Sequence, residues 1–358
     1  MTRTVKGLQA LSFILAVGLG LAQAAQAETL LRWTEGSADR GTRAQAYHWF
    51  ADTVSKRSNG DVRFKFYFGG ALMGHAANVS GIGSGTADIG QIIGAYNPKE
   101  LLAYAVTDVP IVGIDAWVGM MAAYELATTN PTMQKMFDGL NLTYIANQST
   151  GPVEMVCKKL DFKSLDDIKG AKLRGSGPFS PIMTSLGANV ISLSQEDVYS
   201  ALDTGLVSCN QQYIQGVIPY RQYEVTDQLI LIDLGQIFAF GLVMNKDSYE
   251  RLPEKDRKII RETGREFIDH YGKLLYDAID GDLAKMKKEG SEFHMTVTSL
   301  SDADKAKLSQ AADAYVGTWI KQANAAGLPG QELREEFVRL VGKYDAIREQ
   351  KGYPWAPK

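Results

Sequence analysis

The sequence has few of the residues and motifs that catalysis usually needs. Of its 358 residues, 2 are cysteines and 4 are histidines, and no two histidines have a metal-site spacing such as H-x-x-x-H. The chain contains no G-x-S-x-G, P-loop or G-x-G-x-x-G motif. These absences argue against a serine hydrolase, a nucleotide-binding enzyme and a zinc enzyme. The residues indicate no cofactor and no protein-held metal.

An excess of charge of either sign is also missing. The formal net charge is −3, and lysine and arginine are spread along the chain without a basic stripe. We therefore expect no nucleic-acid partner. Beyond the N-terminal segment, no stretch approaches 18 consecutive apolar residues, so we expect the remainder to be soluble. An apolar fraction of 45% is enough for a packed core.

The N-terminal segment resembles an export signal. Arg3 and Lys6 precede an apolar run from Leu8 to Ala22, and the small-residue pattern Ala25–Ala27 follows. This order predicts a signal peptide, residues 1–27, that is cleaved after Ala27, with an uncleaved anchor as the alternative. We expect a periplasmic protein.

The two cysteines, Cys157 and Cys209, both lie in strand-like segments. In an exported protein one disulfide is chemically reasonable, and two buried free thiols are equally so. The residues alone leave both alternatives open.

Segments with strand and helix periodicity alternate along the chain. "TLLRWTE", the helical run that ends at Asn59-Gly60, and "DVRFKFYF" begin a β-α-β order that predicts a wound α/β domain. A second α/β unit is expected at about 158–236, and a long polar helix after Pro253. The length of the chain suits two lobes.

Polar and aromatic residues follow several of the expected strands. The carboxyl ends of strands face the ligand crevice in wound α/β domains, so these residues are candidates for ligand contact. One charge with amides and aromatic rings is typical of a binding site rather than a catalytic one. The candidates are Trp33, Glu35, Tyr96, Gln148, Arg174, Phe179, Asn210, Gln211, Gln212, Tyr213 and Phe238.

The stretch "DIKGAKLRGSGPFSPIMTSLGANVISLSQEDVYSALDTGLVSCNQQ" resembles the central motif of the C4-dicarboxylate-binding receptors of tripartite ATP-independent periplasmic (TRAP) transporters. "HWFADTVSKRSNGDVRFKFYFGGALMG" is similar to the family's first helix, second strand and glycine turn. The resemblance implies a two-lobed α/β fold of the type II periplasmic-binding-protein class, with a long helix spanning both lobes. The expected division is 28–150 plus about 238–275 for lobe I, and 151–237 plus about 276–358 for lobe II.

The resemblance also implies a function. The family's binding arginine corresponds to Arg174, whose guanidinium would give a substrate carboxylate two parallel charge-assisted hydrogen bonds. The chain would then be a receptor, not an enzyme, that delivers an organic acid to TRAP membrane permease subunits. The sequence departs from the family pattern where Gln212 replaces an asparagine that contacts ligand, and where Cys209 replaces a glycine.

Alternatives remain at this point. The chain could serve an ATP-driven importer, or less plausibly be an exported α/β enzyme. The aromatic residues at strand ends favour a monocarboxylate with an apolar body over a small dicarboxylate. A metal ion beside the carboxylate and a homodimer formed through long helices both stay open.

Overall fold

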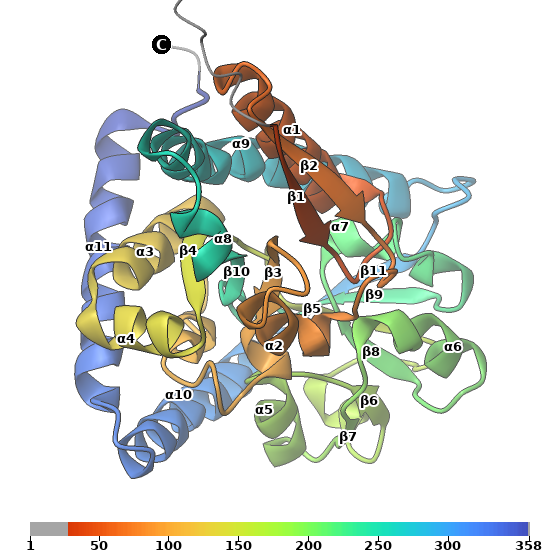
Figure 1. Ribbon diagram of the computed structural model, residues 1–358. Coiled ribbons are helices and arrows are strands. Elements are labelled where there is room, and N and C mark those ends of the chain that lie inside the picture. Colours follow the sequence, from red (N-terminus) through yellow and green to blue (C-terminus); the bar gives the residue numbers. More distant parts are fainter. Residues whose placement is uncertain (1–27, 357–358) are drawn as a thin grey trace, which may run out of the picture.

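The computed structural model describes residues 28–356, which form two α/β lobes, each built on one mixed sheet (Figure 1). The predicted signal peptide lies outside the described residues. The sheet of the first lobe has the order β2-β1-β3-β10-β4, and β10 runs antiparallel to both of its neighbours. Its strands are β1 (Thr29–Thr34), β2 (Val62–Tyr67), β3 (Ile89–Ile93), β4 (Leu142–Gln148) and β10 (Phe240–Asn245).

The sheet of the second lobe has the order β11-β9-β5-β8-β6-β7. Its central strands β5 and β8 are antiparallel and place Cys157 opposite Cys209, and these two residues form a disulfide. The strands are β5 (Glu154–Cys157), β6 (Lys172–Arg174), β7 (Asn189–Ile191), β8 (Cys209–Gln212), β9 (Gln228–Leu231) and β11 (Thr296–Ser299).

Helices cover the sheets on both lobes (Figure 1). The α-helices are α1 (Gly41–Arg57), α2 (Asn78–Gly83), α3 (Ala116–Thr129), α4 (Pro131–Gly139), α5 (Phe179–Ser185), α6 (Val198–Asp203), α7 (Ile214–Val217), α8 (Lys246–Glu250), α9 (Glu254–Lys287), α10 (Asp302–Ala325) and α11 (Gly330–Lys351). The 3-10 helices are η1 (His75–Ala77), η2 (Gly94–Tyr96), η3 (Tyr104–Asp108), η4 (Leu165–Ile168), η5 (Gln195–Asp197) and η6 (Gln222–Glu224). None of the helices within 28–356 is long and apolar enough to cross a membrane.

Two chain segments connect the lobes and run side by side. One follows β4 and the other precedes β10, and they are joined by a bridge between Pro152 and Gln236. The N–H of Thr150 donates to the carbonyl of Ile237 at 3.1 Å, which adds a second link between them. Paired backbone of this kind forms a hinge about which two lobes can open and close.

The 34-residue helix α9 spans the molecule (Figure 1). It contacts α1, α3 and β4 of the first lobe as well as α7 and β11 of the second. Its buried positions, among them Ile260, Phe267 and Leu275, recur at helical spacing and so give it one apolar face along the lobes. The predicted two-lobed α/β fold with a long spanning helix is confirmed.

Helix α11 lies on the first lobe. Its buried residues Leu333, Phe337 and Leu340 join the first lobe's core, and the helix packs along α3. Helix α3 is apolar around nearly its whole circumference, so it needs a cover on the side that faces away from the sheet. The expected division assigned residues 276–358 to the second lobe. Helix α11 instead packs on the first lobe, because it covers the outer side of α3. The other boundaries stay a prediction.

Candidate functional site

A cavity that is partly open to solvent lies between the lobes. The first lobe contributes Arg43, His75 and Tyr96, and the second contributes Arg174 and Tyr213, so both lobes line it. Three apolar side chains, Ile93, Ile237 and Phe240, form an apolar part of the wall. A few polar groups on an apolar wall are typical of a site for a small molecule.

Arg174 is the last residue of β6 and is 2% exposed. Its Nε and Nη2 atoms donate to the carbonyl of Leu193 at 3.0 and 2.8 Å, and Nη2 also donates to the hydroxyl of Tyr96 at 3.0 Å. Within residues 28–356, no carboxylate pairs with this guanidinium and Nη1 makes no hydrogen bond. A buried charge without a counterion is costly, so this site favours an anion.

The hydroxyl of Tyr96 is oriented by the groups around it. Its oxygen accepts hydrogen bonds from Arg174 Nη2 and from the backbone N–H of Gln195, both at 3.0 Å. These bonds occupy the two lone pairs of the oxygen, so its own hydrogen is free to be donated. Burial raises the pKa of Tyr96, which keeps the hydroxyl protonated. Arg174 Nη1 and the Tyr96 O–H are thus two neighbouring donors, a set that suits a carboxylate.

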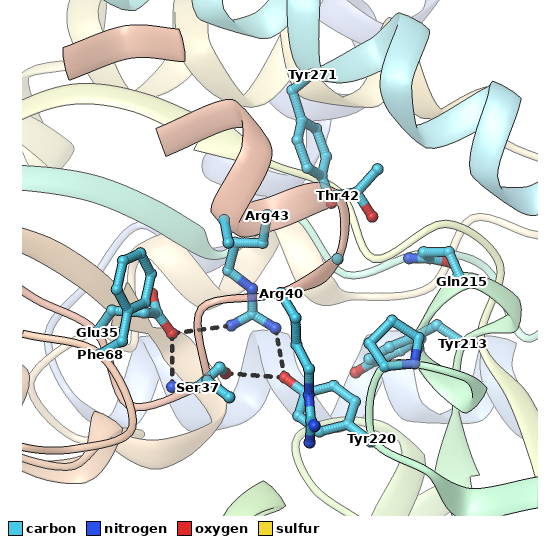
Figure 2. Close-up of a pocket in the computed structure, with 15 residues that line it drawn as sticks. Glu35, Ser37, Arg40, Thr42, Arg43, Phe68, Tyr213, Gln215, Tyr220 and Tyr271 are labelled. Carbon is cyan, nitrogen blue, oxygen red and sulfur yellow. Dashed lines mark hydrogen bonds and ion pairs between the residues drawn. The ribbon is translucent and has the colours of Figure 1, made fainter. Parts of the chain in front are cut away.

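Arg43, in the first turn of α1, is a second guanidinium at the cavity, and its donors are largely occupied (Figure 2). Nη1 donates to Oε1 of Gln91 and Nη2 donates to the hydroxyl of Tyr220, both at 2.8 Å. Nη1 also lies 3.5 Å from Oε1 of Glu35, which forms an ion pair with it. Arg43 is therefore compensated from within the protein.

Glu35 follows β1 and is 1% exposed. Its Oε1 accepts from the N–H of Ser37 at 2.8 Å and lies 3.2 Å from Nε2 of His75. Burial opposes ionisation, but His75, Arg43 and the Ser37 N–H outweigh it and lower the pKa of Glu35 to about 2. Glu35 is therefore an anion at neutral pH.

Tyr220 and Tyr96 connect the two lobes. Tyr220, from the second lobe, shares a hydrogen bond of 2.8 Å with Oγ of Ser37 in addition to its bond from Arg43 (Figure 2). Tyr96, from the first lobe, accepts from Arg174 and Gln195 of the second. Each tyrosine thus bonds to two residues across the cleft, and the structure represents a closed arrangement of the lobes.

The structure brings together three of the predicted site residues, Arg174, Tyr96 and Tyr213, which all line the cavity. Glu35 does not line this cavity, but with Arg43 and Tyr213 it lines an adjoining one (Figure 2). Tyr213 presents an aromatic ring between the two spaces.

The other candidates lie outside the wall of this cavity, and two of them, Gln211 and Gln148, support it through hydrogen bonds. Gln211 Oε1 accepts from the N–H of Ser176, which lines the cavity. Gln148 Oε1 accepts from Nε2 of Gln91, the residue that holds Arg43.

Asn210 and Gln212 are satisfied inside the second lobe. Asn210 Nδ2 donates to Oε1 of Gln222 at 3.0 Å, and Gln212 Oε1 accepts the N–H of Tyr213 at 2.9 Å.

The apolar candidates Trp33, Phe179 and Phe238 pack in cores. Trp33 lies against Tyr47, and Phe238 fills the notch left by Gly119, where an added Cβ would collide with its ring.

Arg43, Tyr220 and His75 were not among the predicted site residues. A survey of strand ends overlooks Arg43 because it belongs to a helix, although "GTRAQAY" places it in the first turn, directly after the loop that leaves β1. Tyr220 follows the short helix α7 beyond β8. In the part of the chain that the structure describes, no group of three His, Cys, Asp or Glu side chains could hold a metal ion.

Two α/β lobes, a paired hinge and a polar cavity between them define a two-lobed binding protein that closes around a small molecule. Residues 35–322 match the model of bacterial extracellular solute-binding protein family 7, DctP, and the chain belongs to this family. The family assignment confirms the resemblance to receptors of TRAP transporters, and this family implies a periplasmic location.

Individual relatives are distant. A solute-binding protein of Albidiferax ferrireducens is 29% identical over 230 residues, which are 61% of this chain and 64% of that protein, just under two thirds of its length. A Sulfitobacter solute-binding protein is 23% identical over 286 residues, or 78% of this chain and 84% of that protein. The crystal structure of a TRAP solute-binding protein from Rhodoferax ferrireducens with copurified benzoate is similar in fold, with a TM-score of 0.79, 22% identity, and coverage of 89% of this chain and 99% of that one.

Proposed function

We propose that this chain is the extracytoplasmic receptor of a TRAP transporter, which binds an organic acid between its lobes and delivers it to the membrane permease subunits. Arg174 holds the carboxylate. The observation that carries the proposal is the buried guanidinium of Arg174, which faces the cavity and has no counterion within 28–356. The benzoate bound by the Rhodoferax protein supports an acid as ligand.

The bound carboxylate accepts from Arg174 Nη1 and from the Tyr96 O–H. Closure of the lobes excludes water from this pair and so strengthens its attraction, because the effective dielectric constant falls. The same closure joins Tyr220 to Ser37 and Arg43 across the cleft. The permease recognises the closed form of the receptor. Because the ligand stabilises this form, the permease binds mainly receptors that carry a ligand.

The receptor is exported to the periplasm and its signal peptide is cleaved after Ala27. It releases its ligand chemically unchanged. The polar groups of the cavity, Arg174, Tyr96 and Arg43, are placed to hold an anion rather than to activate a nucleophile. Uptake is driven by an ion gradient rather than by ATP, which separates this function from that of an ATP-driven importer. Association into a homodimer stays a prediction.

Calorimetry with the Arg174→Ala variant tests the proposal. A panel of organic acids is first screened by thermal shift, in which a ligand at 100 times its Kd adds about 2.7 kcal/mol of stability. Removing one partner of a desolvated charge pair costs about 2–5 kcal/mol, so Arg174→Ala is expected to weaken the best ligand at least about 30-fold. Arg63→Ala is the matched control, because Arg63 is an exposed arginine on β2. An unchanged affinity in Arg174→Ala, or no binding of any acid, overturns the proposal.

A further inference from the structure

The charges around the cavity leave one positive charge without a partner. Arg43 is paired with Glu35 at 3.5 Å, whereas Arg174 meets only a carbonyl and a hydroxyl. His75 lies between two carboxylates, 3.2 Å from Glu35 and 3.8 Å from Glu196 at the cleft rim, so a protonated His75 would have a carboxylate of its own. Among the arginines that line the cavity in the described part of the chain, Arg174 is therefore the one without a carboxylate partner.

The donors of Arg43 are also committed. Nη1 is used by Gln91 and Glu35, and Nη2 is used by Tyr220, so a second carboxylate would have to displace these bonds. It would also come close to the buried anion Glu35. Two like charges in a site that excludes water repel each other strongly, and such repulsion is a common source of selectivity.

We infer that Glu35 restricts this receptor to acids that carry a single negative charge, by neutralising Arg43, the second guanidinium that lines the cavity at Arg174. The inference rests on the proposed function of Arg174. The ligand's carboxylate lies at Arg174, and its uncharged body lies against Ile93, Ile237 and Phe240. Glu35 acts through Arg43, and so it is a specificity-determining residue that need not touch the ligand.

Matched pairs of acids test the inference on the full mature protein. Each pair shares one skeleton and differs by a second carboxylate: benzoate with isophthalate, hexanoate with adipate, and pyruvate with oxaloacetate. Calorimetry at pH 7.5 and low salt is expected to show that the wild type prefers the monocarboxylate of the pairs that it binds by about 100-fold or more. Equal or tighter binding of the dicarboxylates overturns the inference. Binding of neither kind is a different outcome, because it overturns the proposed function itself.

Three variants then change the charge of the site in steps. Glu35→Gln keeps an oxygen for the Ser37 N–H but removes the carboxylate that neutralises Arg43, and it is expected to shift the affinity ratio toward dicarboxylates by at least about tenfold. Arg43→Gln leaves Glu35 uncompensated and is expected to weaken both kinds of acid. The double variant restores one net positive charge and is expected to restore the preference for monocarboxylates.

Thermal melts establish that each variant is folded before its affinities are compared. A folded Glu35→Gln with the wild-type ratio overturns the inference, because the charge of Glu35 then has no influence on ligand choice. If Glu35→Gln does not fold, the comparison of the wild type with Arg43→Gln decides. If Arg43→Gln binds monocarboxylates as tightly as the wild type, the inference is overturned, because the charge of the Arg43–Glu35 pair then does not affect ligand binding.

Discussion

Replacing Tyr220 with phenylalanine removes one oxygen atom that joins the two lobes. This oxygen accepts from Arg43 Nη2 and shares a second hydrogen bond with Oγ of Ser37, both at 2.8 Å. Both partners belong to the first lobe, whereas Tyr220 belongs to the second, so the bonds exist only when the lobes are closed. The substitution therefore weakens the closed form and leaves each lobe intact.

The magnitude follows from the two bonds. A neutral hydrogen bond contributes about 0.5–1.5 kcal/mol net, and one to a charged group about 1.5–3 kcal/mol. Their loss destabilises the closed form by about 2–4 kcal/mol. The ratio of closed to open molecules therefore falls about 30- to 1,000-fold. The apparent affinity falls in proportion wherever the closed form becomes the minor species, because only that fraction holds the ligand.

Calorimetry measures the affinity, and small-angle X-ray scattering measures the radius of gyration with and without ligand. Tyr220→Phe is expected to bind the best acid more weakly and to need more ligand to reach the compact form. Tyr344→Phe is the matched control, because its hydroxyl bonds to Glu125 within the first lobe. If Tyr220→Phe binds and closes like the wild type, the reasoning about this interlobe bond is refuted.

Three further predictions concern single groups. Tyr96→Phe removes the hydroxyl offered to the carboxylate and should weaken the best acid by about tenfold or more in calorimetry; an unchanged Kd would contradict this role. Burial raises the pKa of Asp108 to about 7, although hydrogen bonds from the N–H groups of Ala239 and Phe238 partly offset this rise. The folded protein therefore holds a proton at Asp108 that the unfolded chain releases above about pH 4, and it loses stability as the pH rises from about 4 to 7. Asp108→Asn should remove this loss. Its free energy of unfolding, measured by urea denaturation, should exceed that of the wild type by about 1–4 kcal/mol at pH 8 but not at pH 4. A variant whose unfolding free energy depends on pH as the wild type's does would contradict this prediction. Replacing both cysteines by alanine removes a cross-link between residues 52 positions apart and should cost about 4 kcal/mol, seen as a lower Tm in calorimetry; an equal Tm would show that the cross-link contributes nothing.

The fold could be predicted from the sequence to a large extent. Alternating strand and helix periods indicated the α/β order, and the family motif implied the second lobe and the spanning helix. Packing between distant segments could not be predicted in this way. The parallel pairing of β11 with β9 joins residues almost 70 positions apart, and α11 reaches back to α3 because that helix has a second apolar side.

The site could be predicted in part. The strand-end rule and the motif pointed to Arg174, and the rule also pointed to Tyr96 and Tyr213, three residues that line the candidate cavity. It failed to separate residues that face the cavity from those that face the inside of a lobe, because successive side chains of a strand point to opposite faces and the register was unknown. Asn210 and Gln212 illustrate this, since their side chains bond within the second lobe.

Arg43 shows a different limit. Its place in the first turn of α1 can be read from the sequence, but its pairing with Glu35 depends on how α1 packs beside β1. The disulfide was open for a similar reason: Cys157 and Cys209 are brought together only by the pairing of β5 with β8. Interactions that depend on three-dimensional register leave little trace in one sequence.

A crystal structure of the mature protein with the tightest-binding acid of the panel tests the role of the cavity most directly. We expect the lobes to be closed, the carboxylate to accept from Arg174 Nη1 and the Tyr96 hydroxyl, and the Arg43–Glu35 pair to be intact. An acid bound elsewhere, or one bound between the lobes with its carboxylate away from Arg174, would contradict this role.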